Sequence, residues 1–145
     1  MEAEAIVKFF HLVGMAWGVG GATIVTLLMI KSSKDAELAK AGGKIMSIIS
    51  KLIWGGIILL GITGPILSSM EEPAEGLFRI KMIVVLVLVI NGFLMSFGIK
   101  PKMAKLSPVD GKPTPEMLKV KKMAMISGMI SLICWYTVVA LAKAL

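Results

Sequence analysis

Four long runs of apolar residues, separated by short polar stretches, make up most of this 145-residue chain. A bilayer core about 30 Å thick needs about 20 apolar residues of helix to cross it, and each run reaches that length. The pattern therefore predicts an all-α integral membrane four-helix bundle, with one domain over residues 1–145. The predicted helices cover residues 4–31, 44–69, 76–100 and 115–143.

Glycine and proline mark the predicted breaks between these helices. The breaks are Gly42-Gly43 before the second helix, and Pro101, Pro108 and Pro113 after the third. The triplet Thr114-Pro115-Glu116 has the order of an N-cap, a proline at the first helical position and an acid in the first turn. The fourth helix is therefore expected to begin there.

Composition and charge assign the chain to the membrane. With 57% hydrophobic and only 17% charged residues and a mean hydropathy of +0.87, the chain is too apolar for an ordinary soluble enzyme or a disordered tail. The net charge of +7 would favour nucleic acid in a soluble protein, but most lysines lie in residues 31–44 and 100–122, while residues 70–76 carry three glutamates and no base. The positive-inside rule then predicts cytoplasmic loops at 31–44 and 100–115, both termini outside, and a lipid bilayer rather than nucleic acid as partner.

Polar residues near the outer helix ends are the candidate site. At about 1.5 Å per residue, His11 and Lys81 lie roughly 6 to 8 Å inside their apolar runs. Residues 63–65 of the second helix and 135–137 of the fourth fall in the same layer. Polar groups from all four helices are thus predicted to meet at one depth.

His11 is the only histidine, and three roles stay open for it. It is a ligand of a metal or cofactor, a proton carrier, or a helix-end residue with an ordinary hydrogen bond. An ionisable group inside a membrane is a functional candidate because burying it without a partner is costly. Gly14, Gly18 and Ala22 follow it at small-xxx-small spacing. That spacing predicts close approach of another helix or, alternatively, space for a flat cofactor beside His11.

Other polar residues carry a structural and a functional interpretation as well. Arg79 and Lys81 either extend to outer headgroups or turn inward as a cationic pocket for a carboxylate or propionate. Asn91 is expected to bond a neighbouring helix, and the twelve methionines to act mainly as flexible core filler. The single Cys134 excludes an internal disulfide.

Several short motifs resemble the small CopD-like and HemJ-like membrane proteins. The matching stretches are Val7-Lys8-Phe9-Phe10-His11 with Trp17-Gly18 in the first helix, Gly61-Ile62-Thr63-Gly64-Pro65 in the second, and Leu77-Phe78-Arg79-Ile80-Lys81 through Asn91-Gly92 to Pro101 in the third. HemJ-type proteins are haem-associated and oxidise protoporphyrinogen IX. The resemblance implies an oxidoreductase with haem b, in which His11 and Lys81 have catalytic roles.

The leading hypothesis is accordingly a haem- or porphyrin-binding redox protein. His11 is its metal ligand or proton carrier, and the other predicted cofactor-binding residues are Gly14, Gly18, Arg79, Lys81, Trp135 and Tyr136. One histidine per chain makes bis-His ligation require two subunits, so a homodimer is expected; a monomer would need a methionine, Tyr136, Lys81 or an open position as the other axial ligand. The alternatives are a small metal-ion or anion transporter of CopD-like type and a non-catalytic membrane assembly subunit.

Overall fold

The computed structural model describes residues 1–71, 75–107 and 109–144. These residues form helices joined by short turns, with no β-strand among them. The elements are α1 Glu2–Ser32, α2 Ala36–Met70, α3 Glu75–Phe93, the π-helix η1 Leu94–Ile99, α4 Lys100–Lys105 and α5 Pro115–Ala144.

Four helical stretches of the described residues are long and apolar enough to cross a membrane. They are Glu2–Ser32, Ala36–Met70, Glu75–Lys105 (α3, η1 and α4 in succession) and Pro115–Ala142. The chain is an all-α polytopic membrane protein, as its apolar runs predict, and its surroundings are a lipid bilayer.

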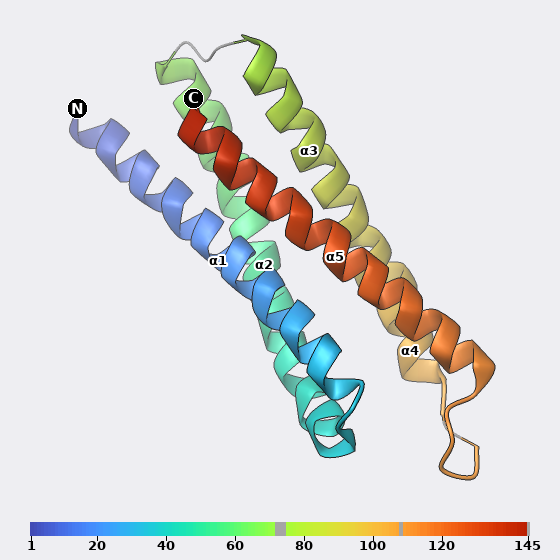
Figure 1. Ribbon diagram of the computed structural model, residues 1–145. Helices are drawn as coiled ribbons and strands as arrows, with labels where there is room; N and C mark the ends of the chain where they lie inside the picture. The colour runs from blue at the N-terminus through green and yellow to red at the C-terminus, as the bar shows by residue number, and fades with distance from the viewer. Residues whose placement is uncertain (72–74, 108, 145) are drawn as a thin grey trace.

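The spans run up and down through the bundle, so both chain ends lie at one end of it (Figure 1). Helix α1 packs against α2 and α5, and α5 packs in turn against α3. We call the end that holds the start of α1 and the last turn of α2 the acidic end, after Glu2, Glu4 and Glu71. The opposite end, with residues 33–35, 106–107 and 109–114, is the basic end.

Glycine allows α1 and α2 to approach closely. A Cβ atom added to Gly56 would lie 2.7 Å from the carbonyl oxygen of Gly14, and one added to Gly14 would lie 3.1 Å from the carbonyl oxygen of Gly56. The two backbones are therefore in direct contact, which is the packing that small residues give to membrane helices.

A fully buried tryptophan joins α1, α3 and α5. Trp135 forms a core cluster with Ala22 and Leu88. Its six-membered ring lies over Gly18, where an added Cβ would be only 2.1 Å away. A second cluster, Ile99 with Val120 and Ala124, joins the end of η1 to the first half of α5.

Asn91 links α3 to α5, which confirms its predicted packing role. Its Nδ2 donates to the carbonyl oxygen of Ser127 over 2.8 Å, and Ser127 Oγ donates to Asn91 Oδ1 over 2.9 Å. Both groups thereby find partners in a region without bulk water.

Helix α2 begins earlier than predicted. Asp35 is its N-cap, with a carboxylate that accepts from the backbone amides of Glu37 and Leu38. The break predicted at Gly42-Gly43 is wrong, since both glycines lie inside α2. A helix tolerates glycine at a cost of about 1 kcal/mol per residue, and a capped helix flanked by good helix formers can absorb it.

The break predicted at Pro101 is also wrong, because the third span continues as α4 to Lys105. Proline has no N–H to donate, and its ring crowds the carbonyl four residues earlier, here that of Phe97. The wider π turn of η1, which directly precedes it, contains this carbonyl. Pro113 lies in the turn as predicted, and Pro108 lies outside the described residues.

The predicted start of the fourth helix is confirmed. Thr114 Oγ1 accepts from the backbone N–H of Met117 over 3.2 Å, and Pro115 is the first residue of α5.

Candidate functional site

His11 hydrogen-bonds α2 near the acidic end. Its Nδ1 lies 2.8 Å from Thr63 Oγ1, and the Thr63 hydroxyl donates to the carbonyl oxygen of Leu59 over 2.7 Å. Because the single hydroxyl proton is used on Leu59, Thr63 accepts from His11. A neutral ring then carries its proton on Nδ1, and Nε2 keeps a free lone pair.

The glycines after His11 accommodate protein rather than open space. Leu59 and Leu60 of α2 lie 3.1 to 3.3 Å from a Cβ added to Gly14, and the Trp135 ring covers Gly18. Of the two interpretations of the small-xxx-small spacing, close helix packing is the one the structure shows at these two positions.

The two cations of α3 differ in exposure. Lys81 is partly buried, whereas Arg79 is exposed. Neither forms a salt bridge within the described part of the chain. The predicted cationic pocket beside His11 stays a prediction.

Trp135 and Tyr136 point in different directions because successive residues on a helix are rotated by about 100°. Trp135 is fully buried, and its Nε1 has no hydrogen-bond partner among the described residues. Tyr136 is 52% exposed, and its hydroxyl lies 3.3 Å from Thr23 Oγ1 of α1. The two rings therefore do not lie together beside His11.

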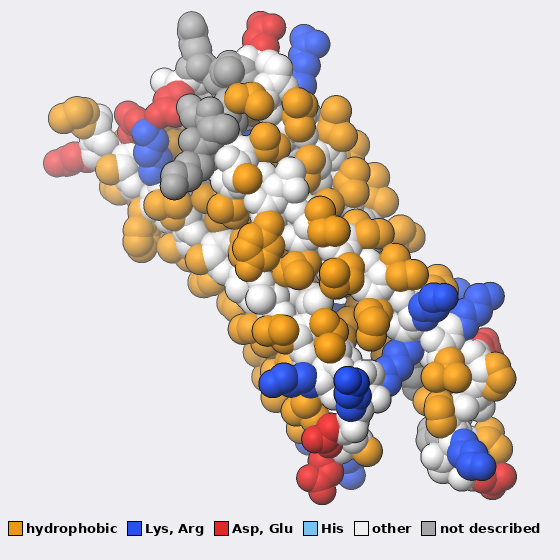
Figure 2. Space-filling view, viewed as in Figure 1, with side chains coloured by type: hydrophobic (Ala, Val, Ile, Leu, Met, Phe, Trp, Pro, Cys, Tyr) orange, Lys and Arg blue, Asp and Glu red, His pale blue; other side chains and the backbone are white. Residues whose placement is uncertain are grey.

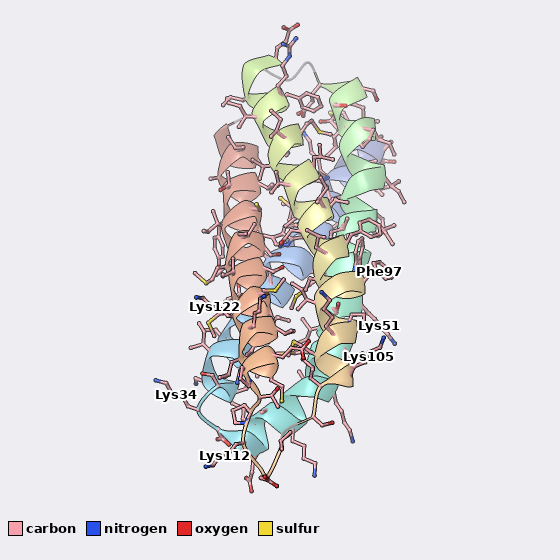
Figure 3. All side chains as sticks on the ribbon, turned by 90° about the vertical axis from the view of Figure 1, so that its right-hand side faces the viewer. Lys34, Lys51, Phe97, Lys105, Lys112 and Lys122 are labelled. Atoms are coloured by element: carbon pink, nitrogen blue, oxygen red, sulfur yellow. The ribbon has the colours of Figure 1, made fainter. Side chains whose placement is uncertain are left out.

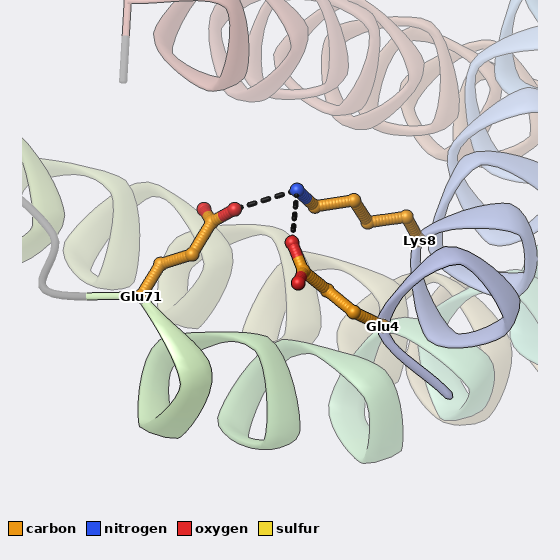
Figure 4. Close-up of polar contacts among 3 residues, drawn as sticks. All are labelled: Glu4, Lys8 and Glu71. Carbon is orange, nitrogen blue, oxygen red and sulfur yellow. Dashed lines mark hydrogen bonds and ion pairs between the residues drawn. The ribbon is translucent and has the colours of Figure 1, made fainter. Parts of the chain in front are cut away.

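Charged side chains join α1 to α2 at the acidic end (Figure 4). Lys8 Nζ donates to Glu4 Oε1 over 2.7 Å and to Glu71 Oε1 over 2.6 Å. Glu4 belongs to the same helix as Lys8, whereas Glu71 directly follows α2. This exposed group and the His11–Thr63 bond both hold the two helices together near the acidic end.

A large cavity lies in the opposite half of the described structure. A cavity of about 730 Å³ is lined by residues of α1, α2, α3 and α5, together with η1 and α4. It extends from Trp135 to the turns at the basic end, where Ser33, Leu106 and Pro113 line it. Figure 2 shows a notch at this end, with Lys or Arg side chains on both sides of it.

The cavity has a mixed lining of apolar and hydroxyl groups. Methionines and leucines from several helices alternate with side chains such as Thr26, Ser47, Ser50, Ser127 and Ser131. Two lysines, Lys100 and Lys121, are partly buried in its lining, and the lining contains no Asp or Glu.

Other lysines of the basic end lie on the outside. Figure 3 shows the side chains of Lys34, Lys51, Lys105, Lys112 and Lys122 around the same half of the bundle. None of these five lines the cavity. The basic end thus carries exposed lysines on its outside and two partly buried lysines in the cavity lining.

Sequence reasoning missed this cavity. Of the predicted site residues only Trp135 lines it; His11, Gly14, Gly18, Arg79, Lys81 and Tyr136 do not. A signal was present, since serine recurs at helical spacing on one face of α2 (Ser47, Ser50) and of α5 (Ser127, Ser131). Such hydroxyls are unusual on a face that only contacts lipid.

No protein-family model, curated protein or solved structure matched the chain. Within the described residues no three His, Cys, Asp or Glu side chains are grouped as metal ligands would be. The function therefore has to be argued from the sites themselves.

Proposed function

We propose that this membrane protein binds an amphipathic molecule taken from the bilayer, in the cavity at its basic end. The observation that carries the proposal is the cavity, whose volume of about 730 Å³ lies in the range of about 300 to 1,000 Å³ usual for small-molecule sites. Its methionine and leucine side chains suit a long apolar group, and its hydroxyls suit a few polar atoms.

Trp135 lies at the inner part of the cavity, and its indole nitrogen has no hydrogen-bond partner among the described residues. A buried donor without a partner costs about 1 to 3 kcal/mol, and Trp135 lines the inner part of the cavity. Less than 1 Å² of this nitrogen is accessible, so an oxygen atom of a bound molecule would become its acceptor only by displacing the side chains that cover it.

The test is extraction and mass spectrometry of the molecules that copurify with the protein in a mild detergent. Ser131→Phe places a ring in the cavity, whereas Ile133→Phe changes a residue of the same helix that is 62% exposed outside it. We expect one class of amphiphile at a fixed ratio to protein, lost in Ser131→Phe and retained in Ile133→Phe. Equal lipid content in both variants, with both monodisperse on gel filtration, would refute the proposal.

The proposed orientation in the membrane follows from the lysines. The basic end, with residues 31–44 and 100–115, faces the cytoplasm, and both termini face outward. In a Cys134→Ser background, a cysteine at Ser33 should resist a membrane-impermeant maleimide in intact cells, while one at Glu2 should react. The reverse labelling would invert the orientation.

A second candidate function, haem or porphyrin binding at His11, has one supporting observation. The Thr63 bond orients the imidazole and leaves Nε2 available, as outer-shell partners do for ligating histidines. Because Leu60 and Trp135 occupy the space at Gly14 and Gly18, a porphyrin plane would have to lie on another side of the imidazole. Lys81, on α3, would then hold an acidic substituent, and haem would supply the redox chemistry.

An absorption spectrum tests this second candidate. We expect a Soret band after haem addition to the wild type, loss of the band in His11→Ala, and a shifted band in Thr63→Val. The absence of a band in all three would remove haem and leave the amphiphile proposal unaffected. A band of equal height in His11→Ala would assign the haem to other ligands.

A further inference from the structure

The cavity at the basic end has a strong charge imbalance. Lys100 and Lys121 are among its lining residues, and no acidic side chain is. The salt bridges of the described residues are those of Lys8 at the other end, so neither lysine has a carboxylate partner there. Two partly buried cations without a counter-charge favour an anion between them.

The packing of α5 on η1 places both lysines in one region. Ile99 and Val120 belong to the same buried cluster, and Lys100 and Lys121 are the next residues along their helices. Both lie where the cavity reaches Leu106 and Pro113 at the basic end. The positive charge is therefore concentrated near the mouth and not spread along the cavity.

The inner part of the cavity is long and uncharged. From Lys121 to Trp135, α5 advances 14 residues, or about 21 Å at 1.5 Å per residue. Half of a bilayer core, the depth that one acyl chain fills, is about 15 Å. The lining of α5 over this length consists of small, methionine and serine side chains, among them Ala124, Gly128 and Ser131.

We propose that the ligand is a single-chain lipid with an anionic head, a carboxylate or a phosphate. Its head lies between Lys100 and Lys121, and its chain extends along α5 toward Trp135. This inference rests on the proposed function and adds the chemical class and the direction of the bound molecule. Lysine suits such a head because it is a compact, mobile point charge at a membrane surface.

Quenching of tryptophan fluorescence tests the proposal. In a Trp17→Phe, Trp54→Phe background, Trp135 is the remaining tryptophan. Because it is fully buried, lipid outside the bundle makes no direct contact with its ring. The probes are a long-chain carboxylate with a nitroxide near the chain end, its methyl ester, and the matching alkyl phosphate. If the double substitution does not give a monodisperse protein, Trp17→Phe alone retains Trp54 and Trp135, both of which line the cavity.

Two charge variants separate the cavity lysines from general surface charge. Lys100→Gln with Lys121→Gln removes the two cations in the lining. Lys51→Gln with Lys122→Gln removes the same net charge from α2 and α5 outside it. We expect saturable quenching by the carboxylate and the phosphate at concentrations at least tenfold below the ester. That advantage should fall below twofold in the first variant and persist in the second.

Each other outcome has a defined meaning. Equal affinity for ester and carboxylate, or an advantage that survives the first variant, overturns the anionic-head proposal and leaves amphiphile binding intact. No saturable quenching by any probe refutes the proposed function itself. Displacement of the probe by millimolar inorganic phosphate alone would assign the two lysines to a soluble anion and overturn the lipid.

Discussion

The two ends of this bundle are built differently. At the acidic end, α1 and α2 are joined by the Lys8–Glu71 ion pair, the His11–Thr63 hydrogen bond and the Gly14–Gly56 backbone contact within a few turns. At the basic end, the same two helices and their partners leave a cavity of about 730 Å³. Apolar helices can thus pack tightly or enclose space in one membrane, depending on which side chains face one another.

The largest expected effect comes from enlarging Gly18, which receives the Trp135 ring. A Cβ there would lie 2.1 Å from the ring, so Gly18→Ala should lower the free energy of unfolding by about 3 kcal/mol, as overpacking does. Denaturation in mixed micelles measures it. Gly20→Ala is the matched control, because nothing lies within 4 Å of its added Cβ; equal losses in the two variants would contradict the packing described.

The Asn91–Ser127 pair should give the next effect. A double-mutant cycle with Asn91→Ala and Ser127→Ala should show a coupling of about 1 kcal/mol, because Ser127 Oγ donates to Asn91 Oδ1 across a lipid-surrounded interface, while the bond from Asn91 Nδ2 to the Ser127 backbone carbonyl is lost in Asn91→Ala alone. The measurement is the unfolding free energy of the four proteins. Strict additivity would mean that the bond from Ser127 Oγ to Asn91 Oδ1 does not help to hold α3 to α5.

A smaller effect is expected at the acidic end from Thr63→Val. The substitution keeps the shape and removes the acceptor of His11, at a cost of about 0.5 to 1 kcal/mol. Thr137→Val is the comparison, since among the described residues that hydroxyl bonds the Ile133 carbonyl of its own helix and no other helix. The nitrogen-15 chemical shifts of the His11 ring should also change in Thr63→Val and stay unchanged in Thr137→Val; unchanged shifts in both would refute the bond.

The smallest effect is expected from Lys8→Gln. Exposed ion pairs contribute little and are screened by salt. The melting temperature should fall slightly at low ionic strength and equal that of the wild type in high salt. Lys44→Gln, which removes an exposed lysine at the basic end, should leave the melting temperature unchanged at both low and high ionic strength. A large, salt-independent loss in Lys8→Gln would show that the lysine contributes by packing.

Much of the fold was predictable because membrane crossing is a requirement on length and polarity alone. The four spans and the Thr114-Pro115 start of α5 follow from local patterns. The start of α2 and the continuation of the third span past Pro101 do not follow from local patterns, because glycine and proline destabilise a helix without always ending it. Asp35 caps α2 ahead of its two glycines, and a π turn precedes the proline.

The depth of the candidate site residues along their helices was predictable from the sequence, but the direction in which their side chains point was not. His11 and Thr63 were expected in one layer, and they are hydrogen-bonded. Trp135 and Tyr136 were expected beside them, yet one is buried over Gly18 and the other lies outward near Thr23. Counting residues along a helix gives the height of a side chain, while its rotation toward a neighbour depends on which helices pack together.

The order of residues is enough to predict an all-α membrane protein with four spans and a lysine-rich end, because hydrophobicity and helix length are properties of each segment alone. Where the helices touch and where they separate depends on how they pack against one another. Glycines bring α1 onto α2 at one end, and serines, methionines and two lysines face a common space at the other. That space forms because of how the four helices are rotated relative to one another. The sequence of a single helix does not specify this rotation.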